Sequence, residues 1–127
     1  MTRDLFMRPS LWATFVFNLG GAYLLAFPTS ALGQLAGLPA EVPLFYRIQL
    51  AMFVSVSGGA YAWLARQPRI DRPLVGLAAI AKFAFFAITF VLWLAGEAPG
   101  RGVIITCGDL FFAMVFTWWL VSSQRPL

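Results

Sequence analysis

The chain has 127 residues, of which 61% are hydrophobic and only 11% are charged. Soluble domains carry about 25% charged residues, so this chain has too little polar surface to cover a water-soluble globule. The composition therefore predicts an integral membrane protein. The net charge of +4 comes mainly from arginines that flank apolar runs, and this pattern argues against nucleic acid as a partner.

The sequence has no histidine and a single cysteine, Cys107. These absences remove haem ligation through histidine, multi-cysteine metal sites and histidine general-base catalysis. We therefore predict no metal site and no catalytic residues, and an enzyme is the less favoured class. Cys107 itself is expected to be a small packing residue.

Four apolar runs approach the length of about 20 residues that spans a bilayer. They cover residues 10–27, 44–65, 74–95 and 103–121. Prolines stand between the runs, where helices are expected to begin and end: Pro9, Pro28, Pro43, Pro68, Pro73 and Pro99. The pattern predicts an all-α fold, in which residues 1–127 form one transmembrane domain of four helices in an up-down bundle.

Arginine distribution predicts the orientation of these spans. The N-terminal tail, the connection at residues 66–73 and the C-terminal tail lie on one side of a four-span bundle and carry six arginines: Arg3, Arg8, Arg66, Arg69, Arg72 and Arg125. The other side carries only Arg101 outside the apolar runs. Since positive loops stay inside, both termini are expected in the cytoplasm.

The connection at residues 28–43 is the longest and has leucines at every third position: Leu32, Leu35 and Leu38. This spacing suits a short helix that lies on the outer interface or over the mouth of the bundle. A plain connecting loop is an equally good interpretation.

Polar residues inside the spans fall into two layers when depth is counted at 1.5 Å per residue. The middle layer contains Asn18, Ser55 and Lys82, and the outer layer contains Tyr23, Arg47, Gln49, Thr89 and Asp109. Lys82 lies about 12 Å from the cytoplasmic side, and about 9 Å of depth separates it from Asp109. A charge at the centre of a span costs about 2.5–3.5 kcal/mol on insertion scales, so these residues need partners.

Asp109 is the only acidic residue inside a predicted span, and two cations compete for it. Lys82 would reach it across the layers, whereas Arg47 is closer in depth and suits a bidentate pair. The polar residues either hold the helices together or line a pocket that is open to the outer side. Because intramembrane ionisable groups mark functional sites, we favour the pocket, and we expect Lys82 and Asp109 to face the bundle interior.

Small residues predict close helix packing in the second span. Ala51, Ser55, Gly59 and Trp63 recur every four residues and form a small-residue seam. Such a seam serves either the internal bundle or a homodimer, and we expect the bundle.

The segments "NLGGAYLLAFP" and "LGQLAGLP", followed by three short spans, resemble small bacterial four-helix membrane proteins of the DoxX-like type. The resemblance concerns layout over most of the chain and transfers no site residues. It implies a bacterial inner-membrane location. Some proteins of that type are subunits of quinone-linked oxidoreductases, which implies a quinone as one candidate ligand.

The function that we favour is a small membrane binding or accessory module, whose pocket holds a small ligand or the head group of a lipid or quinone. Two alternatives remain, a structural subunit of a larger membrane complex and a proton-coupled transporter of small molecules. We expect no tightly bound cofactor other than such a lipid or quinone. The expected partners are membrane lipids and either a partner membrane subunit or a second copy of the chain.

Overall fold

A computed structural model describes residues 2–122, and every regular element in that range is a helix. The helices are α1 (Thr2–Ala26), α2 (Ala31–Ala36), α3 (Leu44–Arg66), α4 (Arg72–Leu94) and α5 (Gly100–Ser122). Three of the helices in this range, α3, α4 and α5, are long and apolar enough to cross a membrane. The fourth long helix, α1, has a similar length but carries Arg3, Asp4 and Arg8 near its start.

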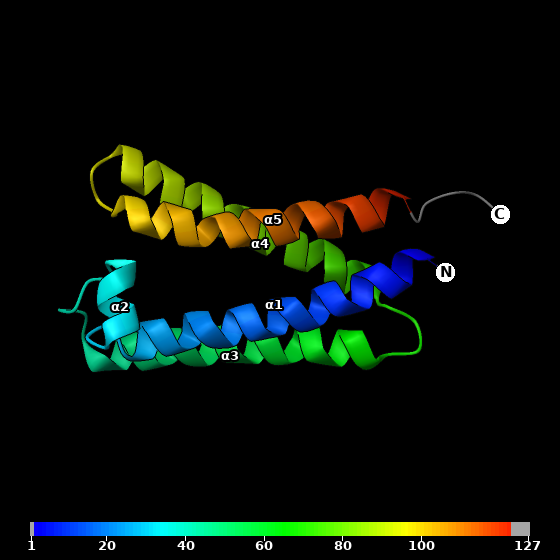
Figure 1. The fold of residues 1–127 in the computed structure, drawn as a ribbon, viewed down its shortest axis with the longest axis horizontal. Helices are drawn as coiled ribbons and strands as arrows, with labels where there is room; N and C mark the ends of the chain where they lie inside the picture. The colour runs from blue at the N-terminus through cyan, green and yellow to red at the C-terminus, as the bar shows by residue number, and fades with distance from the viewer. Residues whose placement is uncertain (1, 123–127) are drawn as a thin grey trace.

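The four long helices form two pairs that run roughly along the same axis, α1 with α3 and α4 with α5 (Figure 1). The beginning of α1 and the end of α5 lie at one end of the molecule, and α2 lies at the other end (Figure 1). The two pairs meet near the end that holds the start of α1 and separate towards α2.

The apolar core lies at the end where the pairs meet. Met7, Leu11, Val75 and Phe116 are fully buried there, and they pack in one cluster with Trp119 and other side chains. The opposite half of the molecule has no comparable cluster among the described residues. The fold is therefore closed by packing at one end and hollow at the other.

The start of α1 differs from the prediction. We expected Pro9 to mark a helix boundary, but α1 begins at Thr2 and Pro9 lies inside it. Tertiary contacts hold these first turns: Arg8 donates to the carbonyls of Ala65 and Pro68 at 2.7 and 3.1 Å, and Trp119 Nε1 donates to Asp4 at 3.0 Å. These contacts offset the backbone hydrogen bond that proline removes.

The other prolines that were predicted to mark boundaries lie at or between helix ends, as expected. Pro43 is the N-cap residue of α3, and Pro73 stands in the first turn of α4. Asp71 caps α4 by accepting a hydrogen bond from the backbone N–H of Leu74 at 3.0 Å. A proline in the first turn costs little because the N–H groups there have no partner within the helix.

The small-residue seam of α3 is shifted by one position from the predicted one. Gly58 faces α1, and a Cβ atom there would lie 3.1 Å from the Cβ of Asn18. Ala51 of the predicted seam is buried, but Gly59 faces open space and Trp63 is 71% exposed, so the later part of that seam does not pack inside the bundle. Because Gly58 and Gly59 are adjacent, residue spacing alone could not tell which of them faces α1.

Candidate functional site: a cavity between the helix pairs

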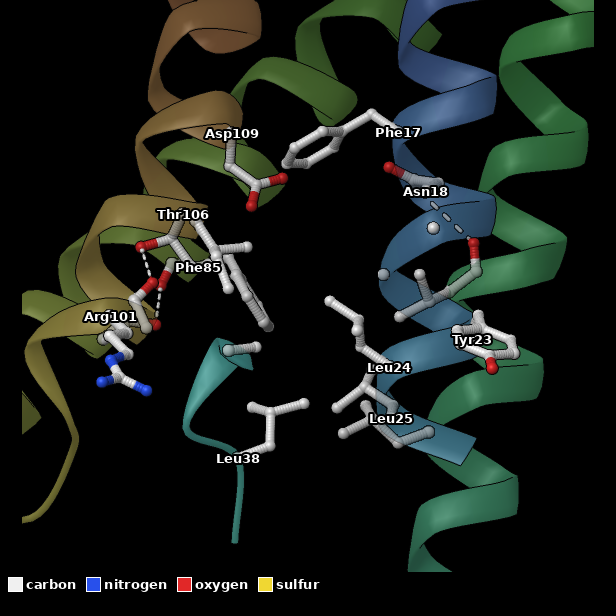
Figure 2. A pocket seen from close by; sticks show the side chains of 18 of the residues that line it. Phe17, Asn18, Tyr23, Leu24, Leu25, Leu38, Phe85, Arg101, Thr106 and Asp109 are labelled. Carbon is white, nitrogen blue, oxygen red and sulfur yellow. Dashed lines mark hydrogen bonds between the residues drawn. The ribbon is translucent and has the colours of Figure 1, made fainter. Parts of the chain in front are cut away.

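A cavity of about 1460 Å³ lies between the two helix pairs. All five helices and the connection between α4 and α5 contribute to its walls. The walls are mostly apolar, with Leu24 and Leu25 on one side, Phe85 on the other and Leu38 on the segment after α2 (Figure 2). An apolar lining with a few polar groups is typical of sites for small molecules, and this cavity exceeds the roughly 300–1,000 Å³ of most such sites.

Lys82 forms the centre of a polar cluster at the deep end of this cavity. Its Nζ lies 2.7 Å from Oδ1 of Asp109 and 3.1 Å from Oδ1 of Asn18. The side chains of Lys82 and Asp109 are only 5% and 13% exposed. An ion pair with this burial is strongly coupled, because little water screens it.

The cluster joins all four long helices. Asn18 of α1 accepts from Lys82 of α4 and donates through Nδ2 to the carbonyl oxygen of Val54 in α3, at 3.3 Å. Asp109 of α5 completes the connection. Figure 2 shows the carboxylate of Asp109 and the amide of Asn18 pointing towards each other from opposite walls.

Three aromatic rings surround the ammonium group. The centroids of Phe17, Tyr61 and Phe112 lie 5.3, 5.4 and 5.8 Å from Nζ of Lys82. A ring face attracts a cation at these distances, more strongly when the cation is desolvated. The rings therefore add cation–π attraction to the hydrogen bonds of the ammonium, and two of them, Tyr61 and Phe112, belong to the apolar core.

Gly58 makes this arrangement sterically feasible. It lets α1 and α3 approach so closely that the Asn18 side chain lies directly against the α3 backbone. A larger residue at this position would push Asn18 away from the carbonyl of Val54. The glycine thereby positions the amide for Lys82.

Helix α2 lies over the wide end of the cavity. Leu32, Leu35 and Ala36 of α2 contribute to the cavity wall. Ser30 caps the helix start by accepting from the N–H of Gly33 at 3.1 Å, and Gly37 ends it in the left-handed conformation with φ of 72°. The connection at residues 28–43 thus contains a short helix, Ala31–Ala36, over the mouth of the bundle, in agreement with the first of the two interpretations of its leucine spacing.

Two close contacts fix α2 in this place. A Cβ at Gly33 would lie 2.4 Å from the carbonyl oxygen of Pro28, so only glycine fits there. Arg101 of α5 donates to the carbonyl of Leu35 at 3.3 Å and so links α2 to the second helix pair. Helix α2 therefore bridges the two pairs at the mouth.

The eight sequence-predicted site residues divide into three groups. Asn18, Lys82 and Asp109 form the polar cluster, although the sequence placed Asp109 in a different layer. Tyr23 and Thr89 line the wider part of the cavity. Arg47, Gln49 and Ser55 do not line it.

Arg47 is not the partner of Asp109. Its Nη1 donates to the carbonyl of Ala26 at 3.4 Å, and its Nε is buried without a hydrogen-bond partner among the described residues. Gln49 is exposed on the surface of α3, and Ser55 is only half-buried. Depth counting could not tell which side of the helix these residues occupy.

Sequence reasoning missed the aromatic residues around Lys82 and the mouth residues Glu97 and Arg101. Tyr61 follows Val54 and Gly58 at helical spacing, so these three residues share one face of α3. That periodicity was the available signal for Tyr61. Nothing comparable marks Arg101, whose role depends on the position of α2.

The donor set of the site suits hydrogen bonding and charge pairing. Among residues 2–122, no group of three His, Cys, Asp or Glu side chains is placed to hold a metal ion. Asp109, Lys82 and Asn18 of the cluster, together with Tyr61, instead line a large apolar space. This combination can hold a molecule with one polar end and an apolar body.

No protein-family model matches the chain, and neither a curated protein nor a solved structure was found to be similar to it.

Proposed function

We propose that this protein is a small membrane binding module that holds a lipophilic molecule between its two helix pairs. The polar end of the ligand would lie against Lys82, Asp109 and Asn18, and its apolar part would extend towards α2. The observation that supports this most strongly is a large apolar cavity that ends on a buried, hydrogen-bonded ion pair.

Structural glue alone would not need such a cavity. An ion pair that only fixes helix packing is best placed in a filled interior, since an empty space forfeits dispersion contacts along its walls. Here the pair lies where the packed core ends and the cavity begins. A bound lipophile would restore the missing contacts and cover the polar cluster.

In this proposal α1 is the fourth membrane span. Its packing along α3 over most of its length supports this role (Figure 1). With four spans, the arginine bias supports a topology with both termini in the cytoplasm and the α2 end of the cavity on the outer side. The ligand would then enter from the outer leaflet or from the outer surface, past α2.

Native mass spectrometry of the protein, extracted from its own membrane in mild detergent, tests the proposal. We expect a bound small molecule in the wild-type protein. Ala81 lines the cavity, so Ala81→Trp should fill part of the space and reduce the bound fraction. Ala84 is exposed and does not line the cavity, so Ala84→Trp is the matched control and should retain the ligand.

Two results would contradict the proposal. One is the absence of ligand binding in the cavity: the wild-type protein carries no small molecule, or Ala81→Trp retains the molecule as well as Ala84→Trp does. The other is co-purification with a stoichiometric membrane protein and no ligand, which would favour the structural-subunit alternative.

A further inference from the structure

Two polar atoms at the floor of the cavity have unused hydrogen-bonding capacity. Asp109 is hydrogen-bonded through Oδ1 only, and within residues 2–122 no group bonds to its Oδ2 or to the hydroxyl of Tyr61. Both residues line the cavity. Neither atom is among the fully buried ones without a partner in that range, so each keeps some accessible surface.

Both groups belong to residues that lie against the same ammonium. Nζ of Lys82 is 2.7 Å from Oδ1 of Asp109 and 5.4 Å from the ring centroid of Tyr61. Oδ2 of Asp109 accepts hydrogen bonds only, whereas the Tyr61 hydroxyl both donates and accepts. A ligand atom that donates one hydrogen bond and accepts another would satisfy both.

The charge of the cavity is already balanced without a ligand. Its walls contain two cations and two anions, with Lys82 paired to Asp109 at the floor and both Arg101 and Glu97 near the mouth. The ammonium has Asp109, Asn18 and three aromatic rings around it. A carboxylate or phosphate head group would add an uncompensated charge in an apolar site, which is unfavourable.

We infer that the site selects an uncharged hydroxyl head group, alcohol or phenol, on an apolar body. The ligand hydroxyl donates to Oδ2 of Asp109 and accepts from the hydroxyl of Tyr61, while the apolar part contacts the leucine-rich walls. This inference rests on the proposed function and adds the chemical class of the ligand. It assigns Tyr61 as a residue that determines specificity.

Four probes with the same chain and different head groups test the inference: hexadecanol, hexadecanoate, hexadecylamine and hexadecane. Binding of each is measured at neutral pH on delipidated full-length protein, by titration followed with native mass spectrometry. We expect hexadecanol to bind at least about ten-fold more tightly than each of the other three, as a site built for a hydroxyl discriminates against analogues that lack it.

Variants separate the contributions of the two groups. Tyr61→Phe keeps the ion pair and the ring, and should weaken hexadecanol roughly five-fold, as expected for one hydrogen bond. Tyr46 is 64% exposed and does not line the cavity, so Tyr46→Phe should change nothing. Asp109→Asn leaves Lys82 without its counter-charge and should make hexadecanoate the preferred probe.

The outcomes distinguish the inference from the proposed function. If the wild type prefers hexadecanoate or hexadecylamine, or if hexadecane binds as well as hexadecanol, the head-group inference is wrong while the binding module stands. If Tyr61→Phe binds hexadecanol as the wild type does, the inference is also wrong. If no probe binds at all, both proposals fail.

Discussion

Replacing Lys82 with methionine should destabilise the protein more than replacing Asp109 with asparagine. Lys82→Met leaves the Asp109 carboxylate, which is 13% exposed, without a cation, and the loss of one partner from a buried pair costs about 3–5 kcal/mol. In Asp109→Asn the ammonium keeps Asn18 and three ring faces. Such ring contacts stabilise a cation by about 0.5–2 kcal/mol, which lowers the penalty for the unpaired ammonium. We therefore expect Asp109→Asn to reduce the free energy of unfolding by about 2–3 kcal/mol.

The double variant Lys82→Met/Asp109→Asn should be no less stable than Asp109→Asn alone, because it contains no unpaired buried charge. The free energy of unfolding of all four proteins is measured in mixed micelles by tryptophan fluorescence. A double-mutant cycle should give a coupling of at least about 2 kcal/mol between the two residues. Effects that add to within about 0.5 kcal/mol would refute the claim that the pair acts as a buried unit.

Three further predictions concern the residues that position the cluster and cover the cavity. Asn18→Leu removes two hydrogen bonds and should cost about 1 kcal/mol at about 0.6 kcal/mol per bond, measured by the same unfolding assay; an unchanged stability would contradict the geometry. Gly58→Leu should lower the free energy of unfolding by about 1–3 kcal/mol through overpacking. Gly59→Leu should be tolerated, because a Cβ at this position meets nothing within 4 Å. Equal effects of the two variants would contradict the orientation of α3 towards α1. Gly33→Ala should displace α2 from the mouth of the cavity. A cysteine introduced at Phe85, in the cavity wall, should then be labelled faster than the same cysteine with Gly33 intact. Equal labelling rates would mean that α2 does not cover the mouth.

Composition was sufficient to predict helices and a membrane environment, because both follow from the average properties of the chain. Three of the expected spans match observed helices closely: residues 44–65 correspond to α3, 74–95 to α4 and 103–121 to α5. The early start of α1 could not be predicted in the same way. It depends on Arg8 and Asp4 reaching α3, α5 and the loop after α3, which are distant in sequence.

The candidate site was partly accessible from the sequence for a related reason. An ionisable residue in an apolar run is conspicuous, so Lys82 and Asp109 were found directly, and the choice between Lys82 and Arg47 needed the structure. Depth along a helix follows from residue count, whereas the direction of a side chain around the axis depends on how the helices are rotated in the bundle. Gln49 and Ser55 were misplaced for this reason, and Tyr61 was overlooked.

The separation of the helix pairs is the feature that no sequence pattern indicated. A tightly packed four-helix bundle and a splayed pair of hairpins have the same hydrophobic pattern when lipid covers the outer faces. The position of the apolar core at one end and of α2 at the other determines that a cavity forms between them. The buried pair of Lys82 and Asp109 lies at the boundary between these two halves.

A density map of the protein purified from its native membrane would test the central proposal most directly. We expect elongated density between the α1–α3 pair and the α4–α5 pair, with its polar end within about 3 Å of Asp109 and Tyr61, as hydrogen bonds require. A cavity closed by movement of the two pairs, or filled by a helix of another subunit, would contradict a binding module.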